Sequence, residues 1–401
     1  MTSRTLEGAL DTENTGEHRL AYGLLWCLGL YLRLSVLIVP PLIPQLKRVL
    51  GFSSGDVAIA TSLPLVTLAC GALVAGWLLA RLGARICMLG GLAVMALGSA
   101  LRAVPEDFLP FLLATVVMGA GIAFMQTAIP VLAKLWVPGR VGRASAIYTN
   151  GLLVGELLAA GATGPLVAAW LQEDWQWAFA LWVAPVPLLM LVLSLAGKAL
   201  PMASKLPRSQ GGLTLPDVRD GRMWRLVWLL GCAAALYFCG NVFLPPILED
   251  SERLMLLGPS LASLNAAQML SSALLVIWAD RLLGQRWPLV VITLCALLAI
   301  PAMLVSPGAS IVWTAGVFGF FTSALFIFVL ALPAWLASVE QLPRLMSGML
   351  FFGYLLVFAI TVLGGWLNDV SGHVALAFLP TLVVSVVAML GTRRLLAADH
   401  A

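Results

Sequence analysis

The sequence predicts an all-α integral membrane protein, in which twelve transmembrane helices form two pseudo-symmetric six-helix bundles. The first observation is the composition: 61% of the 401 residues are apolar, 10% are charged and the mean hydropathy is +0.99, whereas about 25% of the residues of a soluble domain are charged. The second is a series of twelve apolar stretches, each of roughly the 20 residues that cross a bilayer core. The third is an internal repeat, because the last six stretches echo the first six.

Short connectors separate the apolar stretches, except where the Pro- and Gly-rich basic segment 198–223 divides six spans from six. The predicted spans are 20–44, 56–79, 86–103, 108–133, 144–169, 175–197, 224–248, 260–279, 288–305, 311–337, 345–367 and 373–392. We therefore expect five parts: an N-terminal tail (1–19), a six-helix bundle (20–197), a linker (198–223), a second six-helix bundle (224–392) and a C-terminal tail (393–401).

The distribution of basic residues predicts the orientation of the chain. If both termini are cytoplasmic, that side receives most of the Lys and Arg residues, including the cluster in 198–225, as cytoplasmic loops normally do. The opposite side then holds four basic residues, Lys47, Arg48, Arg102 and Arg253. Residues 1–18 lack the features of a cleavable signal. We expect a multi-pass protein of the bacterial inner (plasma) membrane, whose net charge of +4 follows from this bias and not from nucleic-acid binding.

The two halves of the chain repeat one another. Three pairs of segments correspond in register: 39–43 with 244–248, 76–85 with 278–286, and Pro130 with Pro333. Parallel repeats of six helices, related by an axis along the membrane normal, are an architecture for alternating access. The repeat therefore favours a transporter.

The connector after the second span carries a recognisable motif. It resembles the loop signature of the major facilitator superfamily, G-x-L-x-D-R-x-G-R-R/K, at Gly76, Leu78, Arg81, Gly83 and Arg85. The corresponding connector of the second half contributes Asp280, Arg281, Gly284 and Arg286. Ala80 replaces the aspartate of the first copy, a departure that affects the usual charge latch of this half and not the fold. The resemblance implies a major facilitator-type fold and a conformational role for these loop residues.

Within that superfamily the chain resembles the group of cyanate and 2-nitroimidazole transporters. The resemblance rests on residues of three spans: Arg33, Pro41, Leu42, Pro44 and Gln45; Thr61, Leu63, Pro64 and Val66; Gly119, Gly121, Ile122, Gln126, Pro130 and Lys134. It implies a secondary active transporter of a small-molecule substrate, which we expect to act as a monomer. Because this group is chemically mixed, the resemblance does not name the substrate.

Arg33 lies near the middle of the first span, where a charge costs about 2.5–3.5 kcal/mol. Pro40, Pro41 and Pro44 follow it by 7, 8 and 11 residues, close to the same helix face, and they free carbonyls that must be buried or wetted. These features predict a bent helix that lines a cavity, in which the guanidinium binds an anionic group. The alternative is a permanent internal salt bridge.

Glu156 lies in the middle of the fifth span and is the only other ionisable side chain predicted deep in the membrane. A carboxyl group there binds or releases a proton according to its exposure and to nearby charges. In the fold of the resembled superfamily the first and fifth helices are close, so Arg33 and Glu156 are expected to pair. Glu156 is predicted to carry a coupling proton, or else to be a counter-ion of Arg33.

Other polar side chains in the spans are candidate substrate contacts: Gln126, Tyr148, Asn150, Asn241 and Gln268. An isolated Asn or Gln in a membrane helix more commonly bonds to another helix, and that is the alternative for each. Gly151 and Gly155 are predicted to form a close-packing surface. Aromatic residues of the tenth and eleventh spans, such as Phe326 and Tyr354, either face lipid or form an apolar wall opposite Arg33.

Several classes of function lack their residues in this sequence. No nucleotide-binding glycine loop or Walker lysine is present, and His18, His373 and His400 lie in tails or a loop, outside any Ser-His-Asp or metal grouping. The six cysteines lie in or beside apolar spans, which favours packing. We therefore predict no enzyme, metal or cofactor, but proton-coupled symport of a small anionic or polar organic solute, cyanate-like or a small carboxylate. The alternatives are proton-antiport export of small heteroaromatic drugs such as nitroimidazoles and, more distantly, a non-transporting membrane sensor.

Overall fold

The computed structural model describes residues 3–49, 51, 54–104, 107–170, 175–197, 200–201 and 216–397, all of whose regular elements are helical. The elements are α1 (Ser3–Leu37), α2 (Val39–Val49), α3 (Ser54–Leu101), α4 (Phe108–Trp136), α5 (Val141–Trp170), α6 (Gln176–Val183), α7 (Val186–Ala196), α8 (Gly221–Asp250), η1 (Leu254–Leu256), α9 (Leu257–Leu282), α10 (Arg286–Val305), α11 (Ser310–Leu336), α12 (Leu342–Ser371), η2 (Val374–Phe378) and α13 (Leu379–Ala397). The all-helical membrane fold predicted from the sequence is confirmed.

Ten helical segments of the described residues are long and apolar enough to cross a membrane. One of them, 63–101, runs through the two spans predicted at 56–79 and 86–103. The 30 residues of α5 are a further span, because a rise of about 1.5 Å per residue more than covers a core of about 30 Å. With 63–101 counted as two spans, the structure agrees with the twelve predicted ones.

The predicted connector 80–85 is wrong as a loop, because α3 continues through it with a single interruption. Gly83 has φ of 83° and ψ of 166°, a backbone conformation that residues with a Cβ rarely adopt. One glycine thus makes the bend for which the sequence suggested six residues. The predicted linker also ends earlier than 223, since α8 begins at Gly221 with Asp220 accepting a hydrogen bond from Arg222 N at 2.8 Å. Residues 198–199 and 202–215 of this linker lie outside the described residues.

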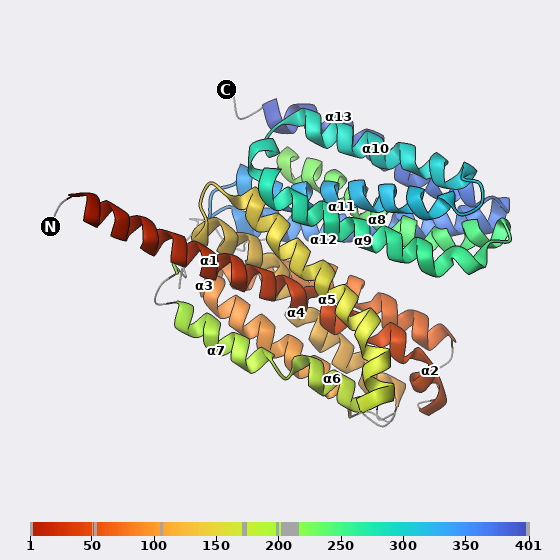
Figure 1. Ribbon diagram of the computed structural model, residues 1–401, viewed down its shortest axis with the longest axis horizontal. Helices are drawn as coiled ribbons and strands as arrows, with labels where there is room; N and C mark the ends of the chain where they lie inside the picture. Colours follow the sequence, from red (N-terminus) through yellow and green to blue (C-terminus); the bar gives the residue numbers. More distant parts are fainter. Residues whose placement is uncertain are drawn as a thin grey trace.

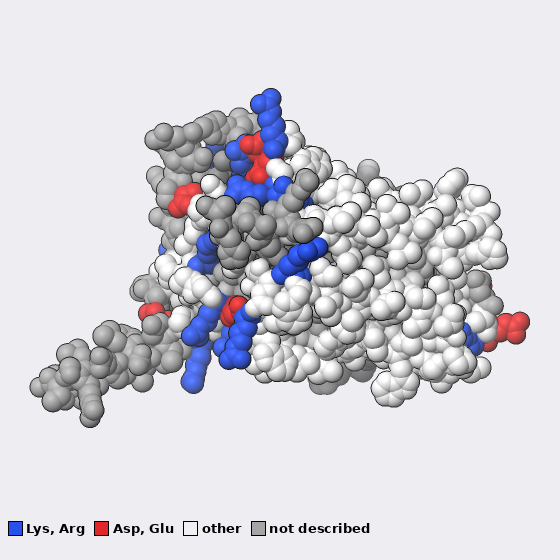
Figure 2. All heavy atoms as spheres, turned by 90° about the horizontal axis from the view of Figure 1, so that it is seen from above, with Lys and Arg blue, Asp and Glu red and all other residues white. Residues whose placement is uncertain are grey.

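The helices form two groups that lie side by side, α1–α7 and α8–α13 (Figure 1). Both chain termini lie at the same end of the molecule, which we call the terminal end. The helix α1 projects beyond the bundle there (Figure 1). Figure 2 shows most of the visible Lys and Arg side chains toward this same end, with a smaller group at the opposite end. We refer to the opposite end as the far end.

Helices α1 and α5 pack backbone to backbone, which confirms the predicted close-packing surface. A Cβ on Gly151 or Gly155 would overlap the carbonyl groups of Trp26 or Leu30, and a Cβ on Gly29 would overlap that of Tyr148. Only glycine permits this approach. The contact holds the middle of α1 against the middle of α5.

The two halves touch through backbone groups at the terminal end. Asp280 of α9 accepts a hydrogen bond from the backbone N–H of Arg143, at the start of α5, at 2.9 Å. Lys134, in the last turn of α4, donates to the carbonyls of Ala334 (2.7 Å) and Ala337 at the end of α11. Acceptors at a helix start and cations at a helix end both complement the helix dipole. We call these contacts the terminal latch.

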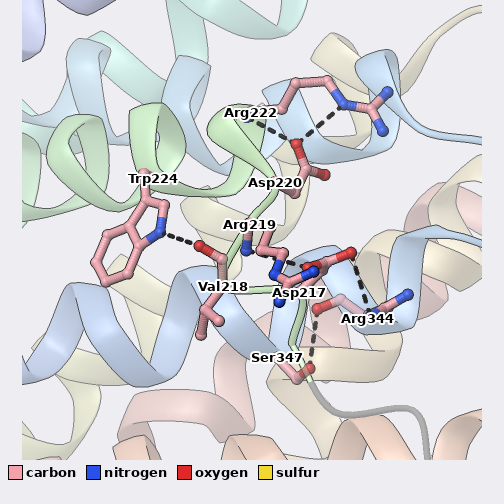
Figure 3. A network of polar contacts seen from close by, with 8 residues as sticks. All are labelled: Asp217, Val218, Arg219, Asp220, Arg222, Trp224, Arg344 and Ser347. Carbon is pink, nitrogen blue, oxygen red and sulfur yellow. Dashed lines mark hydrogen bonds and ion pairs between the residues drawn. The ribbon is translucent and has the colours of Figure 1, made fainter.

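The first half has no carboxylate equivalent to Asp280, because Ala80 stands there. Instead Gly76 packs on α12 so closely that a Cβ would lie 2.5 Å from that of Ser347. The last linker residues are attached to the same stretch of α12, where Asp217 Oδ2 lies 3.4 Å from Arg344 Nη2 (Figure 3). The indole N–H of Trp224 donates to Val218 O at 2.8 Å, so this end of the linker is also tied to α8 (Figure 3).

Candidate functional site

A small cavity lies between the two halves. The centre of a water molecule reaches about 20 Å³ of it. Six helices contribute its lining: Arg33 from α1; Thr149, Leu152, Leu153 and Glu156 from α5; Ala234, Tyr237 and Phe238 from α8; Gln268 from α9; Thr322, Ser323 and Phe326 from α11; and Tyr354 from α12. The cavity therefore combines one cation, one carboxylate, several hydroxyl groups and aromatic rings. It has room for about one water molecule in this conformation.

Arg33 and Glu156 line this cavity together, as expected from their spans. The glycine-mediated contact of α1 with α5 sets the separation of their backbones. Among the described residues the two side chains form no direct ion pair, so the expected ion pair is wrong. Their charges instead interact over a longer distance, across the cavity. The guanidinium instead lies over the ring of Phe238, 6.0 Å from its centroid, within the range of a cation–π contact. Arg33 thus keeps its donors available for another acceptor.

The carboxylate of Glu156 is held by the opposite half. The hydroxyl of Tyr237 on α8 donates to Glu156 Oε1 at 2.7 Å. A hydrogen bond to an ionised group is shorter and stronger than one between neutral groups. This bond therefore joins α5 to α8 directly beside Arg33.

Gln126 reaches the cavity through a tyrosine. Its side chain is buried and donates to the hydroxyl of Tyr354 on α12 at 2.8 Å. Tyr354 lines the cavity, whereas Gln126 does not. Gln126 is accordingly placed behind the wall, where it orients the phenol of Tyr354.

The other predicted contacts divide between the wall and the helix packing. Gln268 lines the cavity, and its amide donates to Asn265 Oδ1 at 3.3 Å. Asn241 lies outside the lining and donates to the backbone carbonyl of Tyr237 at 2.9 Å. Its bond is within one helix, so it holds the turn that carries Tyr237.

Tyr148 and Asn150 also lie outside the lining. The hydroxyl of Tyr148 accepts from Ser145 at 3.0 Å. Asn150 accepts from the indole of Trp26 at 3.0 Å and donates to Ser272 of α9 at 2.9 Å. Asn150 therefore joins the two halves between the cavity and the terminal latch, which is the packing role that was the alternative for it.

The lining residues that were not singled out from the sequence include Tyr237 and Phe238. The chain has only five tyrosines, and two of them, Tyr237 and Tyr354, line this cavity. A tyrosine in an otherwise apolar span needs a partner for its hydroxyl. The small number of tyrosines was therefore the one signal in the sequence that could have indicated Tyr237 as a cavity residue. No pattern in the sequence distinguishes Phe238 from the phenylalanines that face lipid.

The predicted loop residues lie at the terminal end. Arg81 is exposed and stacks 4.3 Å above the ring of Trp77, and Arg85 donates to Ser194 O at 3.2 Å. Gly284 has φ of 86°, and a Cβ on it would lie 2.5 Å from the ring of Trp335. Arg281 and Arg286 are exposed. Of the predicted loop motif residues, Asp280 makes the hydrogen bond that joins the halves.

Comparisons with known proteins agree with this architecture. Residues 25–318 match the sequence profile of the Major Facilitator Superfamily. The 2-nitroimidazole transporter of Escherichia coli (strain K12) is 26% identical over 88% of this chain and 89% of its own length. The cyanate transport protein CynX of the same organism is 28% identical over 39% of this chain and 41% of its own length. The solved proton:xylose symporter XylE superimposes with a TM-score of 0.72 at 12% identity, covering 94% of this chain and 95% of the other.

Proposed function

Because the chain belongs to the major facilitator superfamily, we propose that it is a secondary active transporter of a small anionic or polar organic solute, cyanate-like or a small carboxylate. Arg33 is the observation that carries this proposal, because it lines a closed cavity between the two halves. A guanidinium is always ionised and offers a planar fork of donors that suits carboxylate-like groups. Alternating access requires a site that both halves share, and the cavity lining comes from both.

The substrate is small under this proposal. In this conformation the centre of a water molecule reaches only about 20 Å³ of the cavity, far below the roughly 300–1,000 Å³ of open small-molecule sites, so the halves must separate slightly to admit even a small substrate. Phe238, Phe326 and the two tyrosines provide an apolar wall around Arg33. An ion or flat molecule with one anionic or dipolar end and a polarisable body satisfies both surfaces.

Glu156 is the proposed proton carrier. It lies in the cavity with Arg33, and its partner Tyr237 belongs to the other half. Relative movement of the halves breaks or forms this hydrogen bond, and the affinity of the carboxylate for a proton changes with it. Uptake with a proton also offsets the charge of an anion against an inside-negative potential, which opposes it by about 2.3 kcal/mol per charge per 100 mV.

We place the terminal end in the cytoplasm of a bacterial inner membrane. Most of the basic residues lie at this end (Figure 2), as the positive-inside rule expects. The bundles 20–197 and 224–392 then move relative to one another around the cavity, with the linker 198–223 and both tails in the cytoplasm, and one chain is the transporting unit.

Export of a small heteroaromatic compound by proton antiport is the second candidate. Two observations favour it: a nitroimidazole-transporting relative covers 88% of the chain, and aromatic rings form much of the cavity wall. Flat heteroaromatic rings stack on such walls.

Transport into vesicles separates the two candidates. Purified protein is reconstituted into liposomes, and uptake of labelled cyanate, small carboxylates and 2-nitroimidazole is measured with a proton gradient of either direction, with Arg33→Ala as the control. Symport predicts that an anion accumulates inside the vesicles when protons flow inward, and that this accumulation depends on Arg33. Accumulation of the nitroimidazole against the proton gradient favours the exporter, and binding without any flux would support a sensor and contradict both.

A further inference from the structure

Arg102 is a buried cation to which the proposed mechanism assigns no role. It follows α3 directly and is 0% exposed. Its Nη2 donates to the backbone carbonyl of Ser35 and to Ser99 Oγ (3.2 Å), while Nε and Nη1 have no hydrogen-bond partner among the described residues. Removing a charge from water without an opposite charge beside it is costly, so the position of this side chain needs a reason.

The end of α1 supplies that reason. α1 stops at Leu37 and α2 starts at Val39, and Pro40 and Pro41 follow without backbone N–H groups. The last carbonyls of a helix lack partners within it, and Ser35 O is one of them. Arg102 satisfies this carbonyl, and the negative end of the helix dipole stabilises its charge. The ring of Phe179, 4.6 Å from the guanidinium carbon, stabilises the cation from another side.

The same turn of α1 carries Arg33, two residues before Ser35. Ser35 is also fixed by its hydroxyl, which donates to Met95 Sδ at 2.9 Å. Arg33 forms no ion pair with any residue in the described part of the chain, so the position of its guanidinium depends on the backbone that bears it. Arg102 bonds to that backbone from outside the cavity.

We propose that Arg102 is a positioning residue for the substrate: by capping α1 where the helix breaks, it holds Arg33 in the cavity. This inference rests on the proposed role of Arg33 as the anion site. It explains why a buried guanidinium with two unsatisfied nitrogens is placed at the break of the helix that bears Arg33.

The second half provides a matched control. Arg253 lies at the far end of α8, and its Nη1 donates to the carbonyls of Ser306 (2.6 Å) and Gly308 (3.0 Å), which follow α10. It is thus an arginine that also bonds to freed carbonyls at a helix end. The cavity residues of this half are uncharged, so Arg253 has no cation to position.

The test is a double-mutant cycle on anion binding. Sodium cyanate and sodium thiocyanate are the probes, with sodium chloride as the reference salt, and dissociation constants are measured by thermal shift on the purified full-length protein. Arg102→Met is expected to weaken anion binding about tenfold, and Arg102→Lys to recover part of that loss because it keeps a charged donor. Arg102→Met in an Arg33→Gln background is expected to cause no further loss, since the one acts through the other. Arg253→Met is expected to bind as the wild type does.

Amide hydrogen exchange tests the cap without any ligand. Faster exchange confined to the end of α1 in Arg102→Met supports it, and unchanged exchange overturns it. Wild-type affinity in Arg102→Met, or losses that add to those of Arg33→Gln, would overturn the positioning role. If Arg102→Met fails to fold, the double-mutant cycle is made with Arg102→Lys in its place. A wild-type protein that binds neither anion would overturn the proposed anion site, and the exchange measurement would then decide the cap alone.

Discussion

Tyr237 and Glu156 form a hydrogen bond, 2.7 Å long, that joins α8 to α5 in the wall of the cavity. Each residue belongs to a different half of the chain, so this bond exists only while the halves are together at that depth. Arg33 lines the same cavity and has no direct carboxylate partner within the part of the chain that the structure describes. The carboxylate, the contact between the halves and the cation therefore lie at one place.

Arg33→Ala should abolish most anion binding. A hydrogen bond to a charged group contributes about 1.5–3 kcal/mol, which corresponds to a loss of affinity of roughly 10- to 150-fold. Arg33→Lys should also bind poorly, because a point charge does not replace a planar fork. Binding and vesicle uptake measure both, with Arg222→Ala, an exposed arginine at the terminal end, as the control. Full uptake by Arg33→Ala would contradict the anion site.

Glu156→Gln should separate exchange from accumulation. The amide mimics a permanently protonated carboxyl, so the variant should exchange labelled substrate across vesicles and fail to concentrate it in a proton gradient. Its binding of an anion should tighten, because a negative charge near Arg33 is gone. Glu249→Gln, exposed near the far end, serves as the control. A well-folded Glu156→Gln protein that still accumulates substrate removes Glu156 from coupling; a protein that loses about 3–5 kcal/mol of stability supports a structural counter-ion.

Tyr237→Phe should weaken the contact of the two halves at the cavity. The phenol donates to Glu156 Oε1, and a hydrogen bond to a charged group contributes about 1.5–3 kcal/mol, so accumulation of substrate in a proton gradient should fall roughly tenfold or more. Substrate accumulation in vesicles measures it, with Tyr31→Phe, which lies outside the cavity lining, as the control. Unchanged accumulation would show that the bond does not affect transport.

Gly29→Ala should destabilise the protein and Gly23→Ala should not, although both lie on α1. A methyl group on Gly29 overlaps the backbone of Tyr148, whereas one on Gly23 meets nothing within 4 Å. Overpacking of this kind costs about 1–3 kcal/mol, and alanine is otherwise the better helix former. Thermal unfolding in detergent compares the two. Equal stabilities would mean that α1 and α5 separate freely.

Asp280→Ala should open the terminal end. The variant loses the acceptor that caps α5, and loss of such a cap costs about 1 kcal/mol, a change of roughly fivefold in a conformational equilibrium. Labelling of single cysteines placed next to Lys134 should become faster, and Asp280→Asn, which retains an acceptor, should change less. Asp369→Ala at the far end is the control. Labelling that does not change would show that Asp280 contributes nothing to closure.

Helix placement could be predicted from the sequence because length and apolarity alone define a membrane span. Predicted boundaries such as 288–305 and 311–337 agree with α10 and α11 within two residues. The bend at Gly83 was missed because one residue with positive φ leaves no polar segment in the sequence. Arg33, Glu156 and Gln268 could be recognised as cavity residues since polar groups avoid lipid. Tyr148 and Asn150 follow the same rule, but Tyr148 bonds within α5 and Asn150 bonds to other helices. Only the three-dimensional packing separates the two cases.

The terminal latch joins side chains on one partner to backbone groups on the other. Replacement of Arg143, Ala334 or Ala337 by most other residues leaves the amide or carbonyl in place, so these positions can drift during evolution. Asp280 and Lys134 have no such freedom, because their side chains are the contact. Natural variants that lose one of them are expected to carry compensating changes elsewhere at this end. Sequence variation in the terminal latch should therefore be concentrated at the residues that contribute only backbone groups.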